Sequence, residues 1–340
     1  MGRSGYGRSA LGVGLAVVLL AGCGEVRTAN VGSVPRAAGA QSNTLPFTST
    51  RAIAPHPAGR PWMLPKARTQ NLLYVSHQST HVNVYNYDSR ELVGELTVFS
   101  PTFGLCTDPA QHIYIPNGGY SQSPNVGVYK HGASKPFRTL SVPAFAYGCG
   151  INPTNGDLCV TSLYGQGGHG EVFIYKHANG VPKTYTNKHL SEVLSCAYDN
   201  SGDMIVVGYI DEYPSPSPAV AQLKKHESEL KLVAIRTQLL GDTYDVKADG
   251  SYVALLSGGE IIDFLIHNRH AMKEGFMQLA NYESFQFALV PTHGELVATT
   301  YQSVDFYDYP SGGYLYSIEG LDEVYGVAVS LAPSTSHVRK

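Results

Sequence analysis

The chain has 340 residues, of which 15% are charged, with a formal net charge of −3, 23 tyrosines and 36 glycines. This charge balance excludes the basic footprint of a nucleic-acid-binding protein and a basic membrane-binding patch. The low charge and the many Tyr and Gly residues are typical of an exported protein made of strands and turns, and no long helical period is present.

The first 23 residues predict a lipoprotein signal peptide. Arg3 and Arg8 precede an apolar run that ends at Ala21; at about a dozen residues it is too short to span a bilayer. The last four residues, Leu-Ala-Gly-Cys, resemble the bacterial lipobox. That resemblance implies cleavage before Cys23 and acylation of this residue. An ordinary secretory signal with an incidental cysteine is the alternative.

Residues 24–68 predict a flexible tether, because they are rich in Ala, Gly, Pro, Ser and Thr and lack a sustained period. Such a segment would hold the following domain away from a membrane surface. Trp62, Met63 and Leu64 lie near its end and are expected to dock on the side of that domain. At the other end of the domain, residues 332–340 are expected to form a short tail.

Residues 69–331 predict one domain built from a repeat of four short strands. The segment 102–142 contains four alternating apolar runs, GLCTD, HIYIPN, NVGVYK and FRTLSV, each closed by turn residues. This spacing is typical of four antiparallel strands. A four-stranded unit of about 45 residues that recurs along the chain is typical of a β-propeller.

The sequence contains six such units, so we expect a six-bladed propeller. First strands are expected at 103–108, 147–152, 194–199, 244–249, 285–290 and 325–330. Fourth strands are expected at 92–98, 137–142, 183–186, 232–237, 275–279 and 314–318. The chain enters on a second strand at Leu72 and leaves on a first strand at Tyr325. The C-terminal strand therefore joins the N-terminal blade, which closes the ring and hides the sheet edges.

The predicted first strands carry mostly small residues on one face and larger apolar residues on the other. This pattern fits innermost strands that converge on the axis of a ring. Asp245 and Lys247 interrupt the small face in the fifth blade. They are expected to form a structural ion pair, and the alternative is a contact with a ligand in the central tunnel.

Four cysteines follow Cys23 in the chain: Cys106, Cys149, Cys159 and Cys196. Export permits disulfides, and four cysteines allow three complete pairings. Cys149 and Cys196 occupy the same position on adjacent first strands, while Cys149 and Cys159 flank a turn. Both pairs leave Cys106 unpaired, and free buried thiols are a further alternative. The sequence leaves the connectivity open.

Polar residues that recur in the repeat do not predict a metal site. Asp108, Asn152, Asp199 and Asp249 each close a first strand, where a side-chain oxygen that caps a turn explains the recurrence more simply than calcium. The recurrent histidines after the third strands are spread one to a blade, whereas metal ligands must converge. We therefore expect no metal and no cofactor.

The repeat, especially GLCTDPAQHIYI followed by VGVYK, resembles the NHL and YVTN types of propeller repeat. The resemblance covers about residues 71–330 and is strongest over 71–175. Together with the lipobox, it makes the chain similar to a group of uncharacterised bacterial lipoproteins with a six-bladed propeller. The resemblance implies an interaction platform, although relatives of the gluconolactonase type are metal-dependent enzymes.

Long loops in three consecutive blades mark the predicted binding surface. They join second to third strands at 117–125, 163–170 and 209–219, on the face where the chain passes from blade to blade. They carry Tyr120, Tyr164, His169, Tyr209, Asp211, Glu212 and Tyr213. Aromatic and polar side chains on neighbouring loops predict a binding patch, and ordinary solvent-exposed loops are the alternative.

We expect an exported, lipid-anchored monomer of the cell envelope that acts as a binding or scaffold module for a protein or glycan, and not as an enzyme. The alternative is a gluconolactonase-like hydrolase with a divalent metal at the tunnel mouth. Glu192 and Glu323 begin first strands in opposite blades and would be its catalytic carboxylates.

Overall fold

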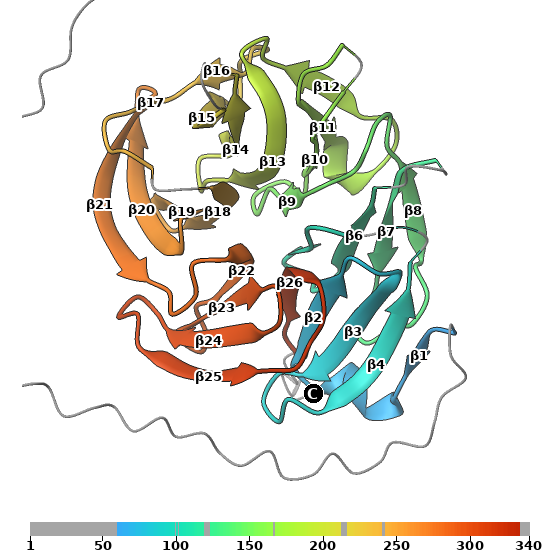
Figure 1. Cartoon of the computed structure of the whole chain (residues 1–340). Helices are drawn as coiled ribbons and strands as arrows, with labels where there is room; N and C mark the ends of the chain where they lie inside the picture. Colours follow the sequence, from blue (N-terminus) through green and yellow to red (C-terminus); the bar gives the residue numbers. More distant parts are fainter. Residues whose placement is uncertain are drawn as a thin grey trace, which may run out of the picture. The chain divides into compact units, whose positions relative to one another are not determined.

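The computed structural model describes residues 60–98, 100, 102–118, 123–165, 167–211, 216–239 and 242–333. These residues form six sheets of four or five strands arranged in a ring, as the sequence predicts (Figure 1). Each sheet is one blade of a β-propeller. The strand nearest the axis is the first strand of each predicted unit.

The first three blades contain the following strands. Blade 1 comprises β2 (Leu72–His77), β3 (His81–Asn86), β4 (Leu92–Thr97) and β26 (Val324–Ser330), with β1 (Trp62–Met63) outside β4. Blade 2 comprises β5 (Cys106–Thr107), β6 (Ile113–Asn117), β7 (Asn125–Tyr129) and β8 (Arg138–Ser141). Blade 3 comprises β9 (Cys149–Ile151), β10 (Leu158–Ser162), β11 (Glu171–Tyr175) and β12 (Lys183–Thr186).

The other three blades follow the same order. Blade 4 comprises β13 (Leu190–Tyr198), β14 (Met204–Ile210), β15 (Ser217–Leu223) and β16 (Lys231–Leu232). Blade 5 comprises β18 (Thr243–Asp249), β19 (Tyr252–Ser257), β20 (Glu260–His267) and β21 (His270–Gln278), with β17 (Ala234–Ile235) beside β21. Blade 6 comprises β22 (Ser284–Val290), β23 (Glu295–Thr300), β24 (Val304–Asp308) and β25 (Tyr314–Ile318).

Helices are short. In the part of the chain that the structure describes, two 3₁₀ helices occur, η1 (Pro65–Thr69) and η2 (Lys176–Ala178). Within the ranges that the structure describes, no helix combines the length and the apolar character needed to cross a membrane. The domain is therefore all-β, and its strands supply nearly all of its regular structure.

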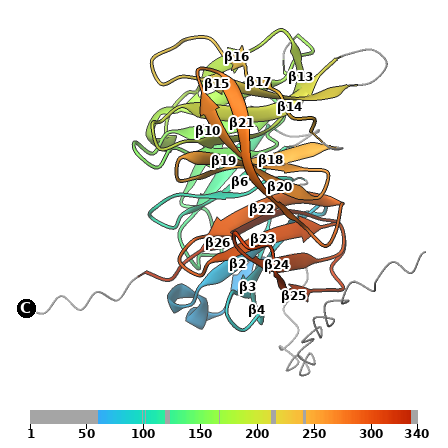
Figure 2. The same ribbon diagram turned by 90° about the vertical axis from the view of Figure 1, so that its left-hand side faces the viewer.

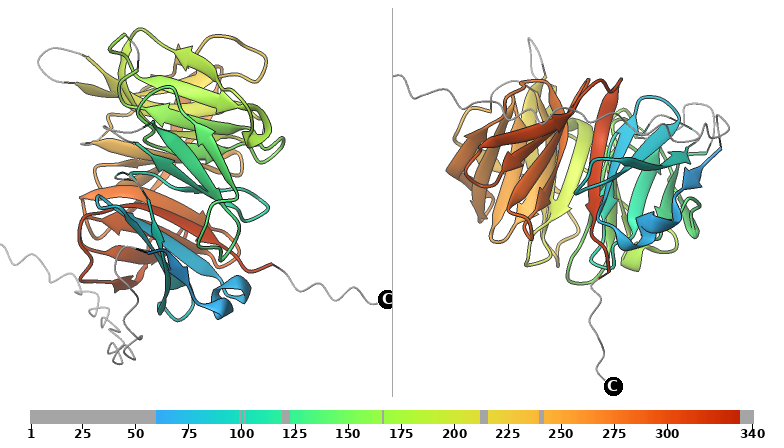
Figure 3. Two further views of the ribbon diagram at one scale, coloured as in Figure 1. Left: turned by 90° about the vertical axis from the view of Figure 1, so that its right-hand side faces the viewer. Right: turned by 90° about the horizontal axis from the view of Figure 1, so that it is seen from below.

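The C-terminal strand closes the ring, which confirms the prediction. β26 pairs antiparallel with β2, from Leu72 opposite Ser330 to His77 opposite Val324. The two strands, at opposite ends of the colour scale, lie side by side in Figures 1 and 3. The innermost strands contact one another in the order β26, β5, β9, β13, β18, β22 and back to β26. Closure therefore gives β2, the first strand of the chain within the ring, a partner on its axial side.

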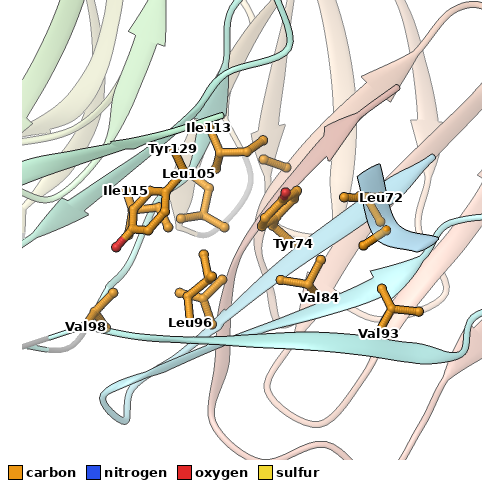
Figure 4. Packing of buried hydrophobic residues seen from close by; sticks show 13 residues of the cluster. Leu72, Tyr74, Val84, Val93, Leu96, Val98, Leu105, Ile113, Ile115 and Tyr129 are labelled. Carbon is orange, nitrogen blue, oxygen red and sulfur yellow. The ribbon is translucent and has the colours of Figure 1, made fainter. Parts of the chain in front are cut away.

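Six apolar clusters hold the blades together, one between each pair of neighbours. Between blades 1 and 2, Leu72 and Tyr74 pack near Leu105, Ile113 and Tyr129 (Figure 4). Burying a Leu, Ile or Val side chain of this kind contributes about 1.5 to 3 kcal/mol. Because both faces of each sheet are covered by neighbours, the second strands β2, β6 and β10 are buried along their whole length.

The chain enters the propeller along the outer edge of blade 1. Trp62 lies opposite Glu95 of β4, and the Leu64 amide donates to the Val93 carbonyl at 2.8 Å. Met63 and Leu64 pack against the apolar cluster between blades 1 and 2. The predicted docking of these residues is confirmed. The segment from Trp62 to residue 68, assigned to the tether by its composition, is therefore part of the blade, because its apolar side chains cover an outer strand.

The outer strand of blade 4 differs from the predicted strand at 232–237. Lys231 and Leu232 pair with β15, and the Val233 amide donates to the Val220 carbonyl at 2.8 Å. The Ala234 amide then donates to the Arg269 carbonyl of blade 5 at 2.9 Å. β17 continues parallel to β21, which lies on the outside of blade 5 (Figure 2). The chain crosses because Val233 and Ile235 join the apolar cluster between the two blades.

Both disulfides differ from the pairs expected from the sequence. Cys106 is bonded to Cys149 and Cys159 to Cys196, so Cys149–Cys196, Cys149–Cys159 and an unpaired Cys106 are all wrong. Cys149 and Cys196 occupy the same position on adjacent inner strands and point in the same direction around the ring. Each of these two residues therefore bonds to a cysteine of the preceding blade, and they do not bond to each other. Each bridge joins two neighbouring blades.

We predict that Cys23→Ser protein, denatured without reductant, contains no free thiol. Peptide mapping should recover the 106–149 and 159–196 links. The cysteines are separated by 43 and 37 residues, so the chain-entropy model assigns about 3 to 4 kcal/mol to each bridge. A Cys106→Ala/Cys149→Ala variant should melt well below the parent. Four reactive thiols, or a 149–196 peptide, would contradict the structure.

Candidate functional site

The predicted patch lies on one face of the ring. Tyr164 and His169 are on the loop between β10 and β11, and Tyr209 and Asp211 are at the end of β14. Tyr164, His169 and Asp211 are exposed, and Tyr209 is half-buried. Tyr120, Glu212 and Tyr213 lie outside the described residues. The four described residues come from two neighbouring blades.

Tyrosines of this face bind carboxylates of the next blade. The Tyr164 hydroxyl donates to Glu192 Oε1 at 2.7 Å. The Tyr209 hydroxyl donates to Asp242 Oδ1 at 3.1 Å and accepts from the Thr243 amide at 3.3 Å. In blade 6, the Tyr301 hydroxyl donates to Glu323 Oε1 at 3.2 Å. Each contact links the end of a second strand to the beginning of the next first strand. We call these contacts the tyrosine bridges.

The bridges explain the two carboxylates of the enzyme alternative. Glu192 accepts from Tyr164, and Glu323 accepts from Tyr301, so each makes a contact between neighbouring blades. Among the residues that the structure describes, no group of three or more His, Cys, Asp or Glu side chains is arranged to hold a metal ion.

Aromatic rings form a nearly continuous collar where the innermost strands begin. Phe103 stacks on Tyr147 with centroids 4.8 Å apart and contacts Tyr325 at 5.2 Å. Tyr325 contacts Phe285 at 4.8 Å, and Phe285 contacts Tyr244 at 5.4 Å. All five side chains are half-buried. We call these five residues the aromatic collar, and the face that carries them and the tyrosine bridges the collar face.

β-Bulges place several residues of this ring. The pairing of β13 with β14 skips Leu194, and that of β18 with β19 skips Tyr244. The pairing of β26 with β2 likewise skips Tyr325, and β22 is irregular between Ser284 and Phe287. An extra residue in one strand breaks the alternation and re-aims the side chain. In four blades, the residue at this position is therefore left out of the regular strand pairing.

The surroundings of the collar are negatively charged. Burial raises the pKa of Tyr147, with further contributions from Tyr244, Tyr325, Glu192 and Asp245. Burial also raises the pKa of Tyr244, reinforced by Asp242 and Glu283, and that of Tyr325, reinforced by Glu323. The tyrosines are thus uncharged at neutral pH. The ionisable groups that act most strongly on them are carboxylates and other tyrosines.

Directly behind the collar, Gln286 joins three blades. Its Oε1 accepts from the Leu105 amide at 3.1 Å and the Val327 amide at 2.7 Å, and its Nε2 donates to the Leu105 carbonyl at 3.1 Å. These partners belong to blades 2 and 1, whereas Gln286 belongs to blade 6. A Cβ at Gly326 would lie 3.1 Å from Gln286 Oε1 and 2.4 Å from Ser76 Oγ. Glycine is therefore required for this approach.

The ion pair expected between Asp245 and Lys247 is confirmed, with Lys247 Nζ 2.8 Å from the carboxylate. Asp245 is buried and also accepts from Ser195 Oγ at 2.5 Å, the Val246 amide at 2.9 Å and the Phe287 amide at 3.1 Å. These partners belong to blades 4, 5 and 6. Asp245 and Gln286 together connect the inner strands from blade 4 around to blade 2.

The sequence reasoning missed the collar and the role of Gln286. The signal for the collar was present, because five of the six predicted first strands begin with an aromatic residue. Regular alternation gave no reason to group these residues, since it does not include bulges. The contact from Gln286 to Leu105 joins residues 181 positions apart, and a repeat pattern holds no information about such a pair.

The fold is shared with solved structures of very different sequence. No protein-family model and no curated protein matches the chain. A nidogen/laminin complex aligns with a TM-score of 0.58 at 11% identity, over 77% of this chain and 99% of the other. A protein of unknown function from Bacteroides caccae aligns with a TM-score of 0.58 at 12% identity, over 77% and 99%. Kuenenia stuttgartiensis hydrazine synthase aligns with a TM-score of 0.55 at 14% identity, over 76% and 82%.

We predict that Gln286→Leu destabilises the protein by at least about 3 kcal/mol, because three buried backbone groups lose their partner and each such loss costs about 1 to 3 kcal/mol. Chemical denaturation of the full chain measures the change. Gln302→Leu, at an exposed turn position, is the control. A loss below about 0.5 kcal/mol for Gln286→Leu, within the range of surface substitutions, would show that the axial hydrogen bonds are unimportant.

Proposed function

We propose that this protein is a lipid-anchored binding module of the cell envelope and that its collar face holds a protein partner. The observation that carries the proposal is the aromatic collar. Five half-buried aromatic rings from five blades meet at one end of the inner strands. Aromatic side chains on a rigid scaffold are the residues on which binding energy is commonly concentrated.

The charge around the collar favours a cationic segment of that partner. Glu192, Asp242 and Glu323 belong to the tyrosine bridges, and Glu283 acts on Tyr244. The face of an aromatic ring attracts Lys and Arg, and carboxylates beside it add to the attraction. A lysine or arginine side chain of the partner is therefore the group that the collar would hold best.

The predicted loop patch extends the same surface. Tyr164 keeps 58% of its surface exposed although its hydroxyl is bonded to Glu192. The bridge fixes the hydroxyl end of the ring, so a partner would meet a pre-organised side chain. Among similar solved structures, the nidogen/laminin complex is an assembly between two proteins, and this precedent supports a protein over a glycan.

The test uses peptide and glycan arrays probed with the full chain. We expect binding to Lys- or Arg-centred peptides over matched neutral and acidic peptides. Tyr325→Leu and Tyr244→Leu should each lower that affinity at least about tenfold, since truncating an aromatic anchor commonly costs about 2 kcal/mol or more. Tyr325→Phe keeps the ring and should keep the binding.

Tyr252→Leu is the matched control, because Tyr252 is an exposed tyrosine at the start of β19, at the other end of the strands. Binding to glycans in place of peptides would overturn the choice of partner. Equal peptide binding by the two collar variants and the parent protein would overturn the site.

The envelope location rests on the sequence of residues 1–23, which lie outside the described residues. We predict that Cys23→Ser moves the protein from the membrane fraction to the soluble fraction. Removal of the signal segment would leave the acyl chains as the anchor, and these contribute about 0.8 kcal/mol per buried methylene. Fractionation of cells that express each form measures the change. Unchanged membrane association of the serine variant would contradict the lipid anchor.

A further inference from the structure

A cavity of about 360 Å³ lies between the innermost strands, at the end opposite the collar. All six blades contribute to its wall. The residues two positions beyond the layer of Gln286 and Asp245 form a ring around it: Cys106, Gly150, Ala197, Lys247, Ala288 and Ala328. Five of these six side chains are small, and this leaves room at the axis. The volume is within the range of about 300 to 1,000 Å³ that is usual for small-molecule sites.

One cation faces this space. Of the described residues that line the cavity, Lys247 alone carries a charged side chain. Most of the other lining side chains are apolar, among them Leu105, Ile151, Leu289 and Val327, and the polar ones are Thr107, Tyr198 and Asn200. The Lys247 side chain is only 20% exposed, so an anion beside its ammonium group competes with less water than it would on the open surface.

The ion pair leaves Lys247 able to bind a second acceptor. An ammonium has three N–H donors, and the two oxygens of Asp245 account for two of them. Asp245 does not depend on Lys247 alone, because Ser195 and two backbone amides also donate to it. The third donor of Lys247 is therefore free to serve a ligand without leaving the buried carboxylate unsatisfied.

The mouth of the cavity is formed by turns between first and second strands. Pro153, Asn200 and Gly250 come from blades 3, 4 and 5 and line the cavity. They lie at the other end of the strands from the tyrosine bridges. A ligand would therefore enter without passing the collar, so the two sites are separate.

We propose that this cavity binds a small organic monocarboxylate with an apolar body. The carboxylate would accept from Lys247 Nζ, and the body would cover the apolar wall. After its pair with Asp245, Lys247 keeps one N–H donor, which fits a single carboxylate, and the scarcity of other polar side chains disfavours phosphate or a sugar. The site is distinct from the collar face and does not depend on the function proposed for it.

The test is a calorimetric titration of the full chain with hexanoate, and with hexan-1-ol as the uncharged analogue of equal length. We expect hexanoate to bind with a dissociation constant in the millimolar range or tighter, and hexanol at least about tenfold more weakly. Lys247→Met should lower the hexanoate affinity at least about tenfold and leave hexanol unchanged. Lys231→Met, an exposed lysine of β16, is the control and should change neither.

A second variant tests the site independently, in case Lys247→Met does not fold. Ala288→Leu fills the cavity without touching the ion pair and should weaken both ligands while the protein keeps a cooperative melt. The proposal is overturned if hexanoate does not bind, if hexanoate and hexanol bind equally, or if Lys247→Met keeps the parental affinity for hexanoate. None of these results bears on the collar, whose variants are measured with peptides.

Discussion

The close approach of six inner strands at one axis is the constraint on which this structure depends. Small residues, such as Gly104 and Gly326, leave space there, and Gln286 and Asp245 fill it with hydrogen bonds. The amide of Gln286 reaches backbone groups of two other blades, so the ring is held at its centre as well as between its sheets. If these buried polar groups lost their hydrogen-bond partners, the folded state would lose stability. They are satisfied only when the ring is closed, and the pairing of β26 with β2 closes it.

This axial layer separates two surfaces of different chemistry. On one side are the aromatic collar and the tyrosine bridges, where carboxylates surround uncharged rings. On the other side is a cavity lined mostly by apolar side chains, with the ammonium of Lys247 in its wall. Both surfaces are built largely from the inner strands, which are the most constrained part of the ring. A ligand on either side would therefore meet a site that is already formed.

The sequence predicted the blades well because their signals are local. Alternating apolar residues and turn residues lie within each unit, and the permuted entry at Leu72 predicts the closure. The missed features depend on departures from the repeat. Bulges at Leu194, Tyr244 and Tyr325 re-aim side chains that a regular strand would place elsewhere. The disulfides depend on which way each cysteine points around the ring, and Gln286 depends on a contact between distant blades.

The central claim is that the collar face, and not the opposite face, meets a protein. Site-specific photo-crosslinking in living cells tests it most directly, with the photoreactive residue placed at Tyr282 or at Tyr252. Tyr282 is 72% exposed, on the link between blades 5 and 6 beside Gly259, and Tyr252 is 40% exposed at the other end of the strands. The account predicts a crosslinked protein from position 282 and none from position 252. A protein crosslinked from position 252 alone would contradict it.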